Sequence, residues 1–247
     1  MRLISLGDSH SLFSFAGVDG VKIYWRGPVT MHRAARDGLL SLIPKNYRAT
    51  SKDILILSFG EIDCRAHLVK QARRNGRSAV QEADILCDRY YEALKRFSSG
   101  FPGKLALSCI IPLNINTLDT CDYNDIEACL ADAVAVRRRM NERLEAMGFP
   151  FVDFREFFDA GNGTIIQERS DFDAHIDSRL SQPVIDAIRS SLSVECLPRI
   201  PPWPWPKALA EPEYKPLIRR VGKRFERVVR KAVRKTYSQI ASYLRTR

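Results

Sequence analysis

Short apolar runs alternate with longer stretches of helical period along the first 196 residues. Five runs rich in isoleucine, valine and leucine predict β-strands at residues 2–6, 21–25, 53–59, 104–111 and 149–154. Helical period predicts helices at residues 79–97, 125–147 and 181–192. Because the apolar runs alternate with helices, we expect a parallel sheet that helices cover on both faces. The predicted fold class is α/β, a three-layer sandwich around a five-stranded parallel sheet.

This architecture also predicts where a site should lie, since ligands of open α/β sheets bind outside the carboxyl ends of the strands. The tetrapeptide Gly7-Asp8-Ser9-His10 follows the first predicted strand and precedes a helix start at residues 11–15. Glycine lets the backbone turn sharply, and a serine at that turn is presented near the positive end of a helix. Two interpretations remain open: Ser9 is a nucleophile, or Asp8 and Ser9 only cap the helix.

Two further polar clusters bear on this choice. The first, FGEIDCRAH, follows the third predicted strand and places four polar side chains in a loop at the same sheet edge as Ser9: Glu61, Asp63, Arg65 and His67. The second, SDFDAHID, places His175 between Asp173 and Asp177, just before the last predicted helix. A serine is inert until a base takes its proton, and a carboxylate orients that base. Ser9 and His175 therefore read as parts of an activated nucleophile, whereas His10 is too near Ser9 in sequence to reach it easily.

At these blocks the sequence resembles the SGNH superfamily, the GDSL-type esterases and lipases. The resemblance covers about residues 1–195 and is carried by GDSH at residues 7–10, GEID at residues 60–63 and the Asp/His cluster around His175. It implies the SGNH hydrolase fold, with a flavodoxin-like sheet, and a nucleophilic Ser9 whose backbone N–H helps to hold the oxyanion. It also implies an oxyanion role for Gly27, which follows the second predicted strand, and site positions for Gly60 and Asp63 of the third block. Arg65 and His67 are further candidate oxyanion or substrate-binding residues because they lie in the same predicted loop.

The third block departs from the family pattern Gly-x-Asn-Asp, because Ile62 stands at the asparagine position. Isoleucine cannot donate a hydrogen bond to an oxyanion, and losing one such donor typically costs about 100- to 1000-fold in rate. Arg65 is the nearest candidate substitute. The competing interpretation is that Arg65 simply pairs with Asp63 or Glu61, and the sequence leaves both open.

The last block departs from Asp-x-x-His, because Phe172 stands three residues before His175. Asp171 and Asp173 flank the expected position, and of these two we prefer Asp173 as the residue that orients the imidazole. A Ser-His dyad oriented by a backbone carbonyl is the third option. Together with Ile62, this departure supports a rival hypothesis, a binding or scaffolding module that kept the fold and lost the reaction.

The resemblance implies an ester substrate, including an O-acetyl group on a saccharide, with water or a sugar hydroxyl as acceptor. No cofactor and no metal are expected, since no HxH or HExxH spacing occurs. The six cysteines form no CxxC pair, so they are interpreted as reduced thiols. The first residues, MRLISLGDSH, contain no long apolar segment of the signal-peptide type. We therefore expect a cytoplasmic protein.

The formal net charge of +10 comes entirely from the last residues of the chain. Residues 1–206 hold 26 basic and 26 acidic residues, whereas residues 207–247 hold 13 basic and 3 acidic ones. Residues 198–216 contain seven prolines, which forbid a regular helix and favour extended chain. The sequence thus predicts an α/β domain at residues 1–196, a Pro/Trp-rich linker at 197–216 and a basic amphipathic helix at 217–247.

The basic helix predicted at residues 217–247 has one apolar stripe, with Lys and Arg on the remaining surface. Such a helix can pack on its own domain or on a second subunit, bind a protein partner, or lie on an anionic membrane at its inner face. Nucleic acid is not an expected partner, because the rest of the chain is neutral and carries no recognised reading motif.

If the basic helix binds membranes, the full-length protein should co-sediment with acidic vesicles, and added salt should weaken this binding because the attraction is electrostatic. Sedimentation that is the same with and without acidic vesicles would eliminate the membrane interpretation.

Overall fold

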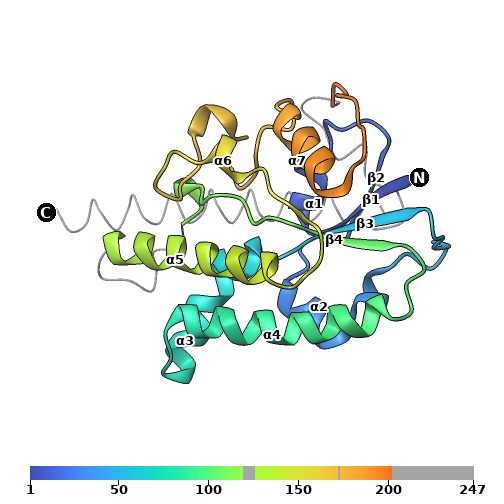
Figure 1. Ribbon diagram of the computed structural model, residues 1–247. Coiled ribbons are helices and arrows are strands. Elements are labelled where there is room, and N and C mark those ends of the chain that lie inside the picture. Colours follow the sequence, from blue (N-terminus) through green and yellow to red (C-terminus); the bar gives the residue numbers. More distant parts are fainter. Residues whose placement is uncertain (119–125, 172, 202–247) are drawn as a thin grey trace, which may run out of the picture. The chain divides into compact units, whose positions relative to one another are not determined.

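A computed structural model describes residues 1–118, 126–171 and 173–201 of the chain (Figure 1). Its sheet has five parallel strands in the order β2-β1-β3-β4-β5. They are β1 (Arg2–Gly7), β2 (Val21–Trp25), β3 (Asp53–Ser58), β4 (Lys104–Ser108) and β5 (Phe151–Val152). The predicted fold class is therefore confirmed, with β4 and β5 shorter than the sequence predicts.

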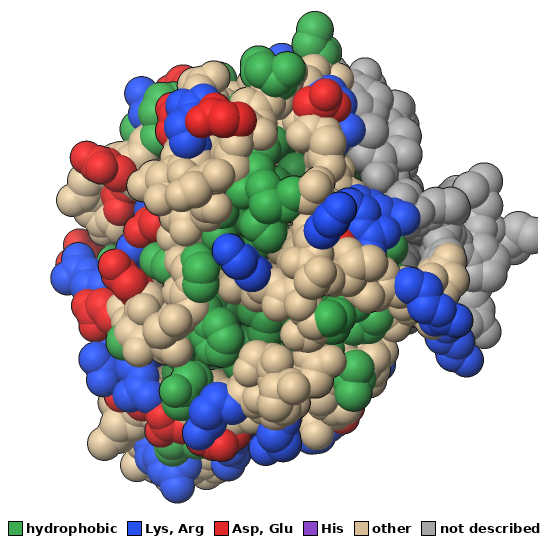
Figure 2. Space-filling model, turned by 45° about the vertical axis from the view of Figure 1, so that its right-hand side comes forward, with side chains coloured by type: hydrophobic (Ala, Val, Ile, Leu, Met, Phe, Trp, Pro, Cys, Tyr) green, Lys and Arg blue, Asp and Glu red, His purple; other side chains and the backbone are tan. Residues whose placement is uncertain are grey.

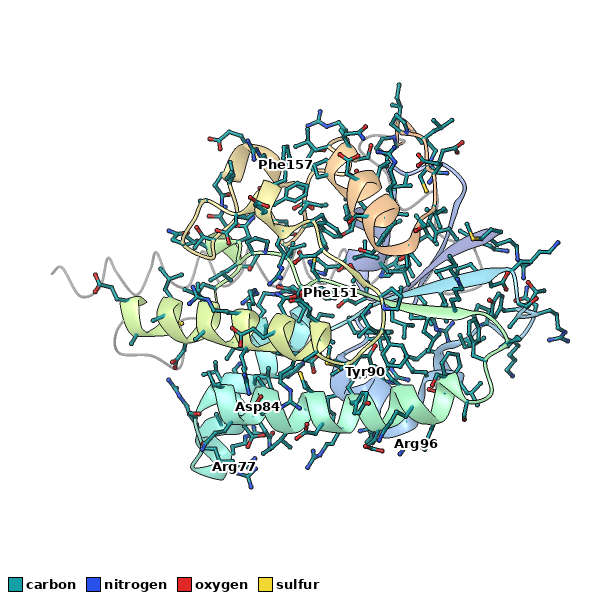
Figure 3. The ribbon with its side chains drawn as sticks, in the orientation of Figure 1. Arg77, Asp84, Tyr90, Arg96, Phe151 and Phe157 are labelled. Atoms are coloured by element: carbon teal, nitrogen blue, oxygen red, sulfur yellow. The ribbon has the colours of Figure 1, made fainter. Side chains whose placement is uncertain are left out.

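Helices cover both faces of this sheet (Figure 1). One face carries α1 (Ser9–Phe13) and α7 (Gln182–Leu192), and their side chains share a core with alternate residues of the strands, including Leu3, Ile23 and Ile56. The other face carries α2 (Met31–Asp37), α4 (Ala79–Ser98) and α5 (Ile126–Glu145). Tyr90 points from α4 toward the sheet and Arg96 points away from it (Figure 3). The third strand is buried at every position, as expected for a central strand.

The polar cluster after β3 is helical, so its prediction as a loop is wrong. The chain enters a helix at residues 61–62, continues through a π-helical turn, η2 (Asp63–His67), and becomes α3 (Leu68–Asn75). No proline or glycine occurs between residues 61 and 75, and Gly76 ends the helix in the left-handed conformation. The helix fixes the direction of each polar side chain, which a loop would not.

Gly7 is required for a reason other than a sharp turn. It lies in β1 with no positive φ, and a Cβ on it would stand 1.9 Å from the carbonyl oxygen of Ser58 on the neighbouring strand β3. Only glycine permits this approach of the two strand ends. The chain remains extended at Asp8 and begins α1 at Ser9, which places that serine at the carboxyl edge of the sheet.

The first residues of the predicted linker lie against the domain. The N–H of Asp19 donates to the carbonyl of Leu197 at 2.8 Å, and the N–H of Arg199 donates to the carbonyl of Gly17 at 2.7 Å. The remaining linker and the predicted basic helix, residues 202–247, lie outside the described residues. In the part of the chain that is described, no helix is long and apolar enough to span a membrane. Side chains of both signs appear on the face shown in Figure 2.

Asn141 connects α5 to the chain that follows β4. Its side chain accepts from the N–H of Ile110 at 2.8 Å and donates to the carbonyl of the same residue at 2.9 Å, and both residues are buried. Asn141→Ala leaves both backbone groups unpaired, so the free energy of unfolding should fall by about 2–3 kcal/mol. Glu142→Ala on the exposed face of the same helix is the control and should change it by less than about 0.5 kcal/mol. Equal urea midpoints for the two variants would refute this role of Asn141.

Candidate active site

Ser9 is the first residue of α1, just after the end of strand β1. Asp8 caps this helix, and its carboxylate accepts from the N–H of His10 at 2.8 Å. The first N–H groups of a helix have no partner within the helix, so the N–H of Ser9 is available to a ligand. The capping interpretation and the nucleophile interpretation of the Asp8-Ser9 pair are thus compatible, because Asp8 caps the helix while Ser9 faces His175.

The structure brings Ser9 and His175 together from 166 residues apart in the sequence. The hydroxyl of Ser9 lies 2.8 Å from Nε2 of His175, and Nδ1 of the same ring lies 2.8 Å from Oδ2 of Asp171. A carboxylate only accepts, so the ring carries its hydrogen on Nδ1 and presents a bare Nε2 to the serine. The ring of Phe13 stacks on His175 with 4.0 Å between centroids. This geometry is that of a Ser-His-Asp relay.

Asp171, and not the preferred Asp173, is the carboxylate beside the imidazole. Nδ1 has one hydrogen to give, and its partner is Asp171, while Asp173 is exposed. The other oxygen of Asp171 accepts from the backbone N–H groups of Asp173 at 2.9 Å and His175 at 3.0 Å. The loop is therefore tightly closed with the acid four residues before the histidine, one more than the family spacing. Phe172 lies outside the described residues.

The two partners of the relay have shifted pKa values. Burial lowers the pKa of His175 and the charge of His10 acts in the same direction, whereas the hydrogen bond that the ring donates to Asp171 acts against them. Burial opposes ionisation of Asp171, but the hydrogen bond and charge of His175 outweigh it and lower the pKa of Asp171. At neutral pH the arrangement is therefore a carboxylate that orients a neutral imidazole, the protonation state that a general base needs.

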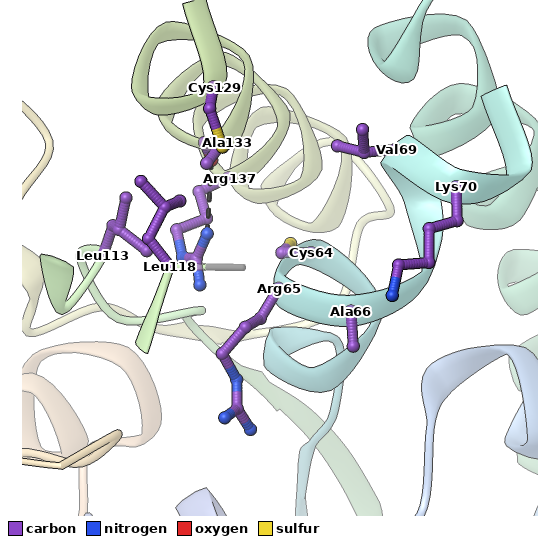
Figure 4. Close-up of a pocket in the computed structure, with 10 residues that line it drawn as sticks. All are labelled: Cys64, Arg65, Ala66, Val69, Lys70, Leu113, Leu118, Cys129, Ala133 and Arg137. Atoms are coloured by element: carbon purple, nitrogen blue, oxygen red, sulfur yellow. Dashed lines mark hydrogen bonds between the residues drawn. The ribbon is translucent and has the colours of Figure 1, made fainter. Parts of the chain in front are cut away.

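Glu61 lies buried between two arginines. Its Oε1 accepts from Arg137 of α5 at 3.0 Å, and Nε of Arg65 lies 3.2 Å from the same oxygen. Of the two interpretations of Arg65, the structure shows the pairing with Glu61. Arg65 and Arg137 line a small hollow of about 20 Å³, enough for about one water, together with apolar side chains of η2 and α5 (Figure 4). The side chain of the adjacent Ile62 has no polar group to offer an oxyanion.

Asp63 faces α2 rather than Ser9. Its carboxylate accepts from the N–H of Met31 at 2.6 Å and from the N–H of His32 at 3.2 Å, so it caps the first turn of α2. Burial, opposed by these two donors, raises the pKa of Asp63 to about 7. The structure therefore gives Asp63 a structural contact at the position where the resemblance implies a site residue.

His67 lies beside a different cavity. With His32 and Asp63 it lines a hollow of about 500 Å³ between α2, α3 and α4. His67 and His32 are both exposed, and partial desolvation of the His67 ring lowers its pKa, with the charges of Lys70 and His32 acting in the same direction. The sequence predicts that His67 lies in a loop flanking Ser9, whereas the structure places it at the end of η2, facing this cavity.

The two glycines implied as site residues follow the strands on either side of β1. Gly27 lies just after β2, where the N–H of Arg26 donates to the carbonyl of Gly7 at 2.9 Å. Gly60 follows β3, and both glycines have positive φ, 77° and 114°. A Cβ on Gly60 would meet Ile110 at 2.7 Å and Met31 at 2.9 Å. Both positions lie at the sheet edge that carries Ser9, and packing as well as φ requires glycine at position 60.

His10 is a residue that the sequence analysis set aside. It is buried and has polar partners on both ring nitrogens, Asp8 at 3.1 Å and the carbonyl of Ala174 at 2.8 Å. In the sequence, His10 stands out only because it follows Ser9. Its contact with the loop of His175 joins segments 164 residues apart, so the sequence could not predict it. Within the described ranges, no group of three or more histidine, cysteine or acidic side chains is arranged to hold a metal ion.

No family model matches the chain, and no curated protein matches it in sequence. Among solved structures, it is similar to a lipolytic protein of the G-D-S-L family from Veillonella parvula, with 13% identity, 78% of this chain and 98% of that chain covered, and a TM-score of 0.45. It is also similar to an extracellular lipase from Streptomyces rimosus, with 13% identity, 77% of this chain and 99% of that chain covered, and a TM-score of 0.46. A third similar structure is a GDSL-like lipase from Bacteroides thetaiotaomicron, with 11% identity, 78% of this chain and 85% of that chain covered, and a TM-score of 0.44. These three structures are lipases or lipolytic proteins, the kind of protein that the sequence resembles, and their low identity to this chain shows nothing about its chemistry.

Proposed function

We propose that this chain is a serine esterase or acyltransferase of the SGNH kind that acts through Ser9. The observation that carries the proposal is the continuous hydrogen-bonded chain from Ser9 through His175 to Asp171, with both contacts at 2.8 Å. Two contacts of this length, in the order nucleophile, base and acid, are what an activated serine requires. Helix capping accounts for Asp8 but gives no reason for His175 to lie on the hydroxyl of Ser9.

In the proposed first step, Oγ of Ser9 bonds to the carbonyl carbon of an ester while Nε2 of His175 takes the hydroxyl proton. The carbonyl π electrons move to its oxygen, which becomes an oxyanion, and Asp171 stabilises the imidazolium. When the oxyanion collapses, the bond to the leaving alcohol breaks and His175 gives that alcohol its proton. The second half repeats these steps with water or a sugar hydroxyl as attacking group, which releases the acyl group and returns the proton to Ser9.

The oxyanion has two proposed donors, the backbone N–H groups of Ser9 and Gly27. The Ser9 group stands at the start of α1, where the helix dipole favours negative charge, and Gly27 follows the neighbouring strand. Ile62 contributes no third donor. Turnover should therefore be slow relative to that of a hydrolase with a complete set of donors, by about the 100- to 1000-fold that one donor supplies.

The substrate class follows from the resemblance and not from any contact in the site. GDSL-type enzymes act on esters, and the solved structures similar to this chain include lipases. An O-acetylated saccharide fits this class. The rival function, a binding or scaffolding module, has Ile62 as its specific support, because a module that no longer catalyses needs no oxyanion donor.

Labelling with a fluorophosphonate separates these two functions. The phosphorus of the probe bonds to an activated serine and expels fluoride, so the wild-type protein should be labelled at Ser9 and Ser9→Ala should not be labelled. The same substitution should abolish hydrolysis of p-nitrophenyl acetate. Ser14→Ala, a neighbouring buried serine just after α1, is the matched control and should retain labelling. A folded wild-type protein that takes up no label would favour the binding module.

The choice of acid partner has its own test. Asp171→Asn removes the negative charge. Because the amide oxygen is needed by the backbone N–H groups of Asp173 and His175, its NH₂ group would face Nδ1 and hold His175 in the wrong tautomer, so kcat/KM should fall by roughly 10³- to 10⁴-fold while the fold is retained. Asp173→Asn two residues away is the matched control, and because that carboxylate is exposed it should lower kcat/KM less than about threefold. Comparable losses in both variants, measured at pH 8 with the same ester, would contradict the assignment of Asp171.

A further inference from the structure

His10 is a buried titratable group outside the Ser9, His175 and Asp171 relay. Its side chain is 6% exposed and lies on the first turn of α1. Nδ1 lies 3.1 Å from Oδ1 of Asp8, and Nε2 lies 2.8 Å from the carbonyl oxygen of Ala174. The second contact spans 164 residues and ends on the residue directly before His175.

Both partners of His10 are acceptors. A backbone carbonyl has no proton to give, and the same Oδ1 of Asp8 already accepts from the N–H of His10 at 2.8 Å. A neutral imidazole has one N–H and would leave one of the two contacts without a hydrogen. Donation at both nitrogens requires the imidazolium, with Asp8 as its counter-ion.

The ring of His10 lies close to the ring of His175, with 4.9 Å between their centroids. The other charged groups that act on His175 are Asp171, on its own loop, and Glu61, at the start of the helix that leads into η2. Glu61 is itself paired with Arg137 and Arg65. A cation at His10 therefore opposes protonation of His175, while the acids favour it.

We propose that His10 is a positioning residue that keeps a fixed positive charge beside His175 and holds the loop of His175 through the carbonyl of Ala174. The charge keeps His175 a neutral base at physiological pH, and the hydrogen bond keeps its Nε2 directed at Ser9. The charge and the contact are independent of catalysis, whereas their consequence for the reaction rests on the proposed function.

The directions in which the pKa values of both rings are shifted agree with this role. Although burial opposes it, the charge and hydrogen bond of Asp8 raise the pKa of His10 to about 9, and the charge of Glu61 and the hydrogen bond to the carbonyl of Ala174 act in the same direction. Burial and the charge of His10 lower the pKa of His175. With His10 made neutral, the pKa of His175 should rise, so more of the base would be protonated at mildly acidic pH and activity there would fall.

The first test uses the full-length wild-type protein, which has only four histidines. Two-bond ¹H–¹⁵N spectra of histidine-labelled protein distinguish an imidazolium from a neutral ring, and His10→Gln identifies the signals of His10. We expect both nitrogens of His10 to carry hydrogen at pH 7.5 while His175 is neutral with its hydrogen on Nδ1. A neutral His10 at that pH overturns the inference. Asp8→Asn, which removes the counter-ion, should make His10 lose its proton at lower pH.

The second test follows His175 in His10→Gln, where glutamine can still donate to the carbonyl of Ala174 but carries no charge. The NMR titration midpoint of His175 should move to higher pH. Relative to wild type, the loss of kcat/KM at pH 6 should exceed the loss at pH 8 by roughly three- to tenfold. Val184→Ala, at a fully buried position on α7, controls for a general loss of stability and should reduce activity equally at both pH values.

An unmoved His175 midpoint in His10→Gln overturns the electrostatic role, whatever the activity. If fluorophosphonate fails to label Ser9, the esterase proposal fails, but the two NMR titrations still decide the inference because they need no turnover. The two proposals therefore fail by different measurements.

Discussion

The contact between Ser9 and His175 is the constraint on which the rest of the site depends. It joins the end of the first strand to a loop just before the last helix, so that loop must be held to within a fraction of an ångström against the sheet edge. Gly17, after α1, permits this approach, since a Cβ there would stand 2.3 Å from the carbonyl oxygen of Ser178. The hydrogen bond from His10 to the carbonyl of Ala174 holds the loop a second time, one residue before the base.

Charge in this region is buried in pairs, which is how a low-dielectric site keeps ionised groups. Asp8 accompanies His10 and Glu61 accompanies Arg137, whereas Asp171 accepts a hydrogen bond from the neutral imidazole of His175. Burial and the neighbouring charge of His10 together lower the pKa of His175, and this favours its neutral ring. In the proposed mechanism the site thus combines charges that set positions with one group, His175, that exchanges a proton.

The sequence predicted the sheet well because its signal is local. Continuous apolar runs specify buried parallel strands, and the residues that follow them mark the edge where ligands bind. The acid partner could not be predicted in the same way, because Asp171 and Asp173 differ only in how a five-residue loop closes on itself. The direction of the Asp63 side chain could not be predicted either, because it depends on the helical conformation of residues 61–67 and on the N-terminus of α2, which is remote in sequence.

Ile62 offers no side-chain donor for an oxyanion, and the structure leaves little room for a substitute. The helix that begins at residue 61 is held at two points, through Glu61 by Arg137 and through Asp63 by α2, so position 62 has little freedom to bring another group toward Ser9. Arg65, the one nearby cation on that helix, is turned to Glu61. Activation of the serine and stabilisation of the oxyanion are separate contributions to rate, and the residues present supply the first more fully than the second. A nucleophile of this kind reacts readily with an electrophile that needs little oxyanion stabilisation, and slowly with an unactivated ester. If the chain is the esterase proposed above, this difference favours an ester with a good leaving group, or one whose own groups supply the missing donor.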